Sequence, residues 1–203
     1  MLERIDDLPA REFDLAGYAA DARPRFADIE DVFWKLERGQ TFRELDDPGY
    51  DAFARGDWTQ ALKIEHEARE AVRRHYAKVA ESGYEPRRLR IVESPVSPYL
   101  QWEMHALRIR AEEGERIRVL AAGAVADRER TGPLPEVIIL GTKALYRVLY
   151  DESGAACGAR RVLDTDVIEH CRVDMDDLWA LGEDLMAYFA REIAPLPPPP
   201  ARP

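Results

Sequence analysis

The stretch from Arg87 to Leu120 constrains the fold more than any other part of the sequence. The segment "RRLRIVES" (87–94) alternates apolar residues with arginines, which is typical of a β-strand, and "ERIRVLAA" (115–122) predicts a second strand. Between them, Ser97 is a good N-cap and Pro98 suits the first helical position, so a helix is expected from Pro98 to about Glu112. A strand, a helix and a strand in this order predict a β–α–β crossover.

Three more strands are expected after this unit. The segments "EVIILG" (136–141), "ALYRVLYD" (144–151) and "AACGARRVLD" (155–164) are apolar and rich in β-formers, and the turn residues 151–154 join the last two into a hairpin. The sequence therefore predicts an α+β fold, with a mixed, mainly antiparallel sheet of about five strands and helices packed on it.

The clearest helix is expected from about Asp57 to Ser82, because Asp57 is an N-cap residue, apolar residues recur at helical spacing and Gly83 is a natural terminator. Residues 29–36 also have helical spacing, although this run also allows a strand at its end. Near the C-terminus we expect a short helix over 167–171 and a longer one from about Asp174 through Phe189.

The chain is expected to form one main domain. Residues 1–30 are acidic and weakly periodic, which predicts an N-terminal arm, residues 31–193 carry the α+β domain, and residues 194–203 form a proline-rich tail of polyproline II type.

Charge and composition narrow the classes of partner. The 203 residues carry a net charge of −10, so phosphate backbones and anionic lipid are repelled at long range, and neither direct nucleic-acid nor membrane binding is expected. The apolar runs are too short to cross a bilayer, and no secretory leader is recognised, so a cytoplasmic location is expected. Cys157 and Cys171 match no metal or redox spacing, which predicts free thiols.

Most catalytic and nucleotide-binding motifs are absent from the sequence. The segment "HEARE" at His66 imitates a zinc-protease helix, but Glu70 replaces the second histidine, so no metal and no cofactor are expected. His170, Arg172 and Asp177 have the spacing of the HxKxxxxD signature of phospholipase-D-like enzymes. Arginine replaces the lysine there, and the segment is expected between helices and not on a strand.

A carboxylate in the 98–112 helix is the most informative polar residue. Glu103 falls within the apolar stripe of this helix, where an unpaired charge is costly to bury. Arg90 and Arg118 on the adjoining strands are candidates to pair with it through their forked guanidinium groups. Either Glu103 and one arginine form an internal ion pair, or Arg90, Tyr99, Trp102, Glu103 and Arg118 line a pocket for a small anion near the helix N-terminus.

Several segments together resemble an actinobacterial family that is catalogued as a domain of unknown function. They are "VFWKLE" (32–37), "RRLRIVESPVSPYLQWE" (87–103), "GERIRVL" (114–120) and "YDESGAACGA" (150–159), and the match covers about residues 30–190. The characteristic positions of the family fall on Trp34, Leu36, Glu37, Arg88, Arg90, Pro95, Tyr99, Glu103, Gly114, Arg118, Tyr150, Asp151 and Gly154.

The resemblance implies a regulatory or protein-interaction module without catalytic activity, with another protein, such as a small helix-turn-helix regulator, as its partner. Two alternatives remain open at this point. One is an enzyme or binding protein for a small anionic ligand held by arginines, with Glu103 as acid or base, and the other is an accessory domain of a biosynthetic pathway.

Overall fold

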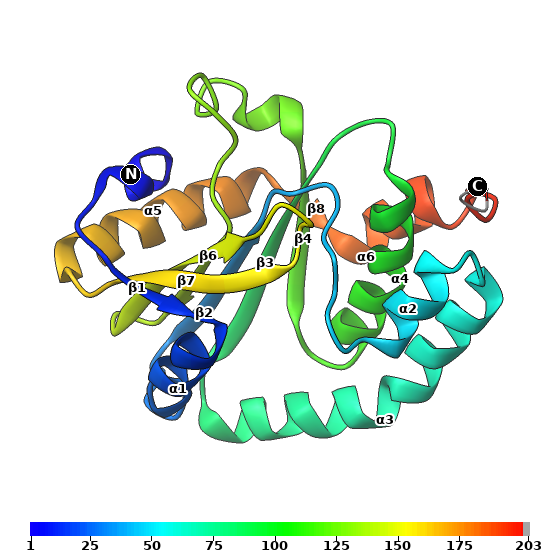
Figure 1. Cartoon of the computed structure of the whole chain (residues 1–203), viewed down its shortest axis with the longest axis horizontal. Coiled ribbons are helices and arrows are strands. Elements are labelled where there is room, and N and C mark those ends of the chain that lie inside the picture. Colours follow the sequence, from blue (N-terminus) through cyan, green and yellow to red (C-terminus); the bar gives the residue numbers. More distant parts are fainter. Residues whose placement is uncertain (201–203) are drawn as a thin grey trace.

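The computed structural model describes residues 1–200, in which one mixed sheet carries helices on both faces (Figure 1). The strands are β1 (Arg11–Asp14), β2 (Val32–Glu37), β3 (Glu85–Val92), β4 (Arg116–Ala121), β5 (Val137–Leu140), β6 (Ala144–Tyr150), β7 (Ala156–Val162) and β8 (Glu183–Asp184). Their order across the sheet is β1-β7-β6-β5-β2-β3-β4-β8. Strands β2, β3 and β4 are parallel neighbours, and the remaining pairs in the described residues are antiparallel.

The predicted α+β class and the 87–120 crossover are confirmed, and so is the β6–β7 hairpin. The number of strands is wrong, because the sheet has eight and not about five. The short strands β1 and β8 were missed at the two edges, where four and two mostly polar residues leave little periodic signal. The third missed strand is β2.

Strand β2 lies where helical spacing was noted over 29–36. It is a central strand paired with β3 and β5, and its side chains alternate: Val32, Trp34 and Leu36 enter the apolar core, whereas Lys35 and Glu37 lie on the other face. Its parallel pairing with β3 adds a second crossover, which runs through α2 (Pro48–Ala54) and α3 (Trp58–Ser82).

The helices begin and end for local reasons. Asp57 caps α3 by accepting from the Gln60 amide, and Gly83 ends it in the left-handed conformation. Ser97 caps α4 (Pro98–Glu112) in the same way, through the Leu100 amide. The two C-terminal helices expected over 167–189 are in fact one helix, α5 (Thr165–Leu181), followed by β8, α6 (Leu185–Tyr188) and a π-helical turn, Phe189–Ile193.

The first thirty residues belong to the sheet and its covering layers. They form a 3₁₀ helix (Leu2–Asp7), β1 and α1 (Leu15–Phe26), and β1 pairs with β7 along its whole length. Leu2 and Ile5 are buried in the same core as α5. None of the helices in residues 1–200 is long and apolar enough to cross a membrane.

The two faces of the sheet differ in character. On one face, Trp34, Leu36, Leu89 and Ile91 pack beneath α5 in an apolar core. On the other face, α1 covers β6 and β7 at one end, and α4 and α6 cover β4 at the other. Between these two apolar clusters, the central strands β2 and β3 present charged side chains to the helical layer, and the candidate site is built on this part of the sheet.

Candidate functional site

A charged stripe runs along the middle of the helix-covered face. The register of β2 and β3 places Lys35 beside Arg88 and Glu37 beside Arg90. Glu37 pairs with Arg88 at 2.7 Å and with Lys35 at 2.6 Å. Burial alone raises the pKa of Glu37, but the two cations lower it well below its usual range, so this carboxylate is ionised at neutral pH.

The same stripe continues toward the carboxyl end of α4. Arg88 also donates to Glu115 at 2.9 Å, and the Tyr76 hydroxyl donates to the other oxygen of Glu115 at 2.6 Å. All three side chains are buried. Because a buried charge is tolerated only when it is paired and hydrogen-bonded, these contacts give Arg88 a structural role.

Arg90 and Glu103 form the internal ion pair that the sequence offered as one alternative. Arg90 is fully buried and its Nε donates to Glu103 at 2.8 Å, while its Nη1 donates to the carbonyl oxygens of Glu37 and Ile91. Burial raises the pKa of Glu103 more than Arg90 lowers it. Glu103 therefore faces an arginine inside the protein and not open solvent.

Tyr99 lies next to this pair. Its hydroxyl donates to Glu44 at 2.6 Å and lies 3.3 Å from Glu103. Burial and the neighbouring carboxylates raise the pKa of Tyr99, so the phenol stays protonated and acts as a donor. Arg90, Tyr99 and Glu103 are therefore brought together as predicted.

Arg118 lies apart from these three residues. It is opposite Leu89 in the sheet, whereas Arg90 is opposite Val119, so the two arginines point to different faces. Arg118 instead donates to the Trp179 carbonyl at 2.7 Å, and its guanidinium lies over the Trp179 ring. One small ligand cannot be held by both arginines.

Trp102 joins an aromatic cluster and not a ligand pocket. Its ring stacks on Phe53 at 5.6 Å with an interplanar angle of 15°, and contacts Tyr50 and Tyr99. The cluster connects α2 and α3 with the first turn of α4, and it also includes Phe42, Trp58 and Tyr150. Tyr150 stacks on Phe42 at 4.9 Å, which links the cluster to the end of β6.

Three other positions of the family pattern, Trp34, Asp151 and Gly154, make structural contacts. Trp34 packs edge-on against Trp179 at 5.3 Å, beneath the Arg87 guanidinium. Asp151 accepts from the Ser153 and Ala155 amides and so closes the β6–β7 turn, which Gly154 completes with a φ of 81°.

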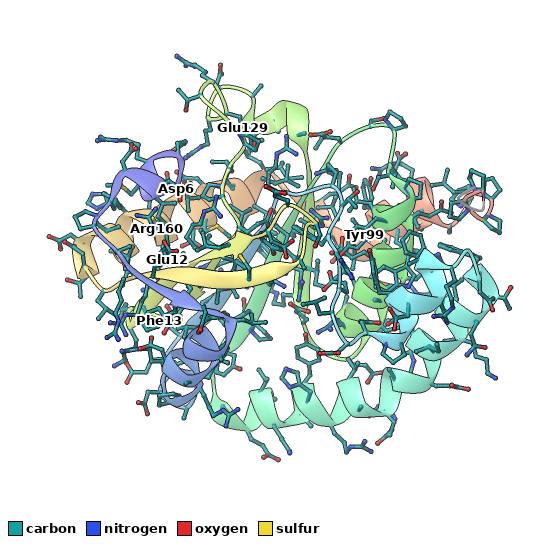
Figure 2. The ribbon with its side chains drawn as sticks, in the orientation of Figure 1. Asp6, Glu12, Phe13, Tyr99, Glu129 and Arg160 are labelled. Atoms are coloured by element: carbon teal, nitrogen blue, oxygen red, sulfur yellow. The ribbon has the colours of Figure 1, made fainter. Side chains whose placement is uncertain are left out.

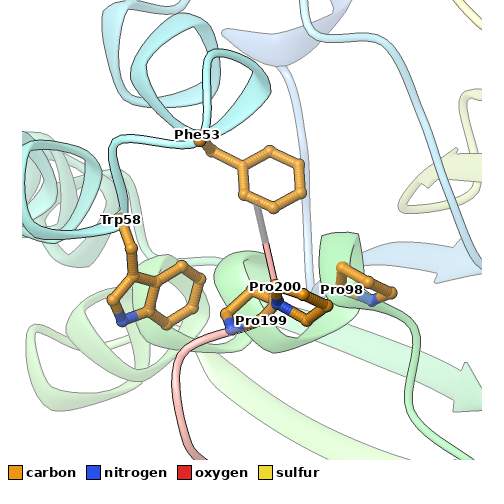
Figure 3. Close-up of a pocket in the computed structure, with 6 residues that line it drawn as sticks. Phe53, Trp58, Pro98, Pro199 and Pro200 are labelled. Carbon is orange, nitrogen blue, oxygen red and sulfur yellow. The ribbon is translucent and has the colours of Figure 1, made fainter. Parts of the chain in front are cut away.

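The rim of the aromatic cluster forms a pocket that contains the chain's own tail. Figure 3 shows the rings of Pro199 and Pro200 between the Trp58 indole and Pro98, with Phe53 beside them. A void of only about 20 Å³ remains between these side chains. The buried amide of Gln101 donates to the Pro197 carbonyl at 2.9 Å and fixes the tail where it enters the pocket.

Both segments that form this pocket can be recognised in the sequence, but their contact in the folded chain cannot. The aromatic residues of 42–58 and the proline run were both evident, yet they lie more than 130 residues apart along the chain. Gln101, whose side chain donates to the tail next to the pocket, carries no sequence signal, because a glutamine in a helix is usually a solvated residue.

A second hollow lies at the carboxyl ends of β2 and β3, as a groove of about 520 Å³. Arg38 crosses it, pairing with Glu129 at 2.6 Å and with Glu93 at 2.8 Å. Figure 2 shows Glu129 on the long segment that leads into β5, well away from Tyr99. Glu136 lines the groove and is buried.

The residues that match the spacing of the HxKxxxxD signature do not form a phospholipase-D-like site. His170, Arg172 and Asp177 all lie on α5, where the His170 ring contacts the Asp166 carbonyl and Arg172 pairs with Asp31 and Glu169. No group of three His, Cys, Asp or Glu side chains in residues 1–200 is placed to hold a metal ion. Cys157 and Cys171 are free thiols.

Several solved structures match this chain at low sequence identity. NucT from Helicobacter pylori is 13% identical, covers 87% of this chain and 98% of its own, and has a TM-score of 0.48. A phospholipase D family member, Nuc from Salmonella typhimurium, is 10% identical over 87% of this chain and 97% of its own, also with a TM-score of 0.48.

TrmBL2, an archaeal chromatin protein with a novel mode of DNA binding, is 11% identical and has a TM-score of 0.41. The match covers 89% of this chain but only 57% of TrmBL2. No curated protein matches the sequence. The family comparison gives a definite result, since one model matches residues 20–190, and the chain therefore belongs to the family described as Domain of unknown function (DUF6879).

Proposed function

We propose that this protein is an interaction module whose aromatic pocket, formed by Phe53, Trp58 and Pro98 with Gln101 next to it, binds proline-rich segments of other proteins. The observation that carries the proposal is the position of Pro199 and Pro200, whose rings line this pocket together with Phe53, Trp58 and Pro98. The tail thus supplies a direct example of the chemistry that the pocket accepts.

The physical match between pocket and ligand is specific. A proline-rich segment has few backbone N–H donors, so it is recognised through ring packing and through its exposed carbonyl oxygens. The pocket provides the Trp58 indole and the Phe53 ring for ring packing, and the Gln101 amide next to it donates to a carbonyl oxygen. A buried amide that donates to a backbone carbonyl favours an extended peptide over an apolar small molecule.

The tail is held lightly enough to be displaced. Of the residues from Ala194 to Pro200, only Pro199 is partly buried and the others are exposed. A partner segment that buries more of its prolines would gain more apolar contact area than the tail does. We therefore propose that the tail competes with the partner and regulates access to the pocket.

The expected identity of the partner as a helix-turn-helix regulator stays a prediction. The alternative of an anionic ligand shared by Arg90 and Arg118 has no support from their placement, since they lie on opposite faces of the sheet. The accessory role in a biosynthetic pathway likewise stays a prediction.

Fluorescence anisotropy of a labelled peptide of sequence APLPPPP, residues 194–200, tests the proposal. We expect saturable binding to the full-length protein, weakened by about tenfold or more in Trp58→Ala and in Gln101→Leu. The neighbouring exposed variant Thr59→Ala is the matched control and should bind as the wild type does. Equal affinity in all four proteins would place peptide binding elsewhere and refute the proposal.

A further inference from the structure

The groove at the ends of β2 and β3 is a second candidate site, separate from the aromatic pocket. It is lined on one side by the segment that follows β2, on another by Glu93 after β3, and closed by Glu136, Arg147 and Tyr150. Its volume of about 520 Å³ is in the range of small-molecule sites. The Gln40 side chain ties its walls together by donating to the Ile91 carbonyl and accepting from the Glu93 amide.

The arginines of the groove are already engaged by the protein. Arg38 uses Nε and Nη2 to bind Glu129 and Nη1 to bind Glu93. Arg147 donates to the Val148 carbonyl and pairs with Asp6 at 3.0 Å. An anion entering the groove would have to break these pairs, so the arginines do not make this a phosphate or carboxylate site.

Glu136 has a carboxylate oxygen without a hydrogen-bond partner in residues 1–200. Its Oε1 accepts from the Arg38 and Gly39 amides at 2.7 and 2.6 Å, whereas its buried Oε2 has no hydrogen-bond partner in residues 1–200. The residue is only 8% exposed. A buried acceptor without a donor costs about 1–3 kcal/mol, and a ligand that supplies the donor recovers this energy.

Two aromatic rings line the same groove as Glu136. Phe42 and Tyr150 both line the groove, and their rings stack at an interplanar angle of 25°. Such a pair favours the hydrocarbon part of a ligand, and since the Arg90 guanidinium already lies over the Phe42 ring at 5.6 Å, Tyr150 is the ring offered to a ligand cation.

We propose that the groove binds a small organic cation whose ammonium or guanidinium group donates to Oε2 of Glu136, with its carbon chain against Phe42 and Tyr150. The carboxylates of Glu93 and Glu129 are already paired to Arg38 and do not contact the cation in this proposal. This ligand class differs from a proline-rich segment, so the two sites are independent.

The charges around Glu136 make cation binding depend on pH. Burial and the negative charge of Glu37 raise the pKa of Glu136 to about 7, opposed by Arg90 and by the amides of Arg38 and Gly39. Arg38, Glu93, Arg147 and Tyr150 also line the groove, and Arg38 is paired to Glu129. A bound cation stabilises the carboxylate, so below pH 7 binding releases a proton.

Isothermal titration calorimetry of the full-length protein with n-butylammonium and n-butylguanidinium tests this inference, with n-butanol as the uncharged control probe. We expect saturable binding of at least one cation at pH 8, no binding of butanol, and about tenfold weaker binding of the cation at pH 6. The observed heat should depend on the ionisation enthalpy of the buffer at pH 6, as proton release requires.

Two variants test whether binding depends on the buried Glu136 carboxylate or only on the negative charge of the groove. Glu136→Gln should weaken binding by about tenfold or more, whereas Glu93→Gln, which removes a half-exposed charge from the same groove, should change it by less than about threefold. Circular dichroism establishes that both variants fold. Failure of both cations to bind the wild-type protein, or equal losses in the two variants, would overturn the proposal. The proline-peptide titration is unaffected by either result.

Discussion

Arg90 on β3 donates from Nε to Oε2 of Glu103 on α4 at 2.8 Å, and this contact joins the centre of the sheet to the helix that carries both Pro98 and Gln101. The pair therefore supports the aromatic pocket from below. It is a positioning element, since neither side chain contacts the tail in residues 1–200.

Removing one member of this pair is expected to be strongly destabilising. Arg90→Ala leaves a buried carboxyl without its partner, and should lower the free energy of unfolding by about 3–5 kcal/mol in urea denaturation. The double variant Arg90→Met, Glu103→Leu should lose less, because no charge is left unpaired.

Arg116→Ala provides a matched control on the adjacent strand. Its side chain is 56% exposed and pairs with Glu85 at the surface, so its loss should cost less than about 1 kcal/mol. If Arg90→Ala and Arg116→Ala had the same effect, the internal pair would not hold α4 on the sheet.

Glu136 should make the protein less stable as pH rises. Its pKa is about 7 in the folded state and about 4.5 when unfolded, so between these values the unfolded chain binds fewer protons and stability falls with increasing pH. At about 1.4 kcal/mol per pKa unit, the contribution approaches about 3 kcal/mol by pH 8. Unfolding free energies at pH 5 and pH 8 should show a smaller difference in Glu136→Gln than in the wild type. An unchanged difference would contradict the assignment.

His105 should have the opposite effect at acid pH. It packs edge-on against Trp58 and Phe189, where burial, together with Arg108, lowers its pKa to about 4. The folded state keeps this imidazole neutral, so stability is lost as pH falls from about 6.5 toward 4. In His105→Phe the melting temperature should decline less over this interval. A wild-type decline equal to that of the variant would assign the acid sensitivity to other groups.

Gly158 is expected to be essential for the edge strand β1. A Cβ added here would lie 2.1 Å from the Phe13 carbonyl oxygen of the paired strand, so Gly158→Ala must push the two backbones apart. We expect a loss of about 1–3 kcal/mol and faster hydrogen exchange of β1 amides. Gly123→Ala, where no atom lies within 4 Å, is the control and should be close to neutral.

The sequence predicted those elements whose signals are local. The α4 helix was identified with both of its ends because Ser97 and Pro98 mark its start, and the β6–β7 hairpin because Asp151 and Gly154 mark its turn. Strand β2 lacked such signals, since its charged Glu37 is buried through an ion pair with Arg88 on β3, a contact that the local sequence does not show. β1 was missed because its pairing depends on Gly158, almost 150 residues away.

Only the part of the candidate site that has a local sequence signal was predicted. Glu103 was recognised as a carboxylate in an apolar stripe, and Arg90 as one of its two possible partners, but only the strand register excludes Arg118. The pocket that holds Pro199 and Pro200 depends on a contact between α4 and the end of the chain, and spacing along the sequence contains no information about such a contact.

The central claim is that the aromatic pocket recognises proline-rich segments and that the tail competes for it. Its most direct test is the affinity of the APLPPPP peptide for the full-length wild type and for the full-length variant Pro199→Gly, Pro200→Gly, measured by titration calorimetry. The variant frees the pocket, so we predict that it binds the peptide about tenfold more tightly or better. Equal affinities, or no binding to either protein, would contradict the claim.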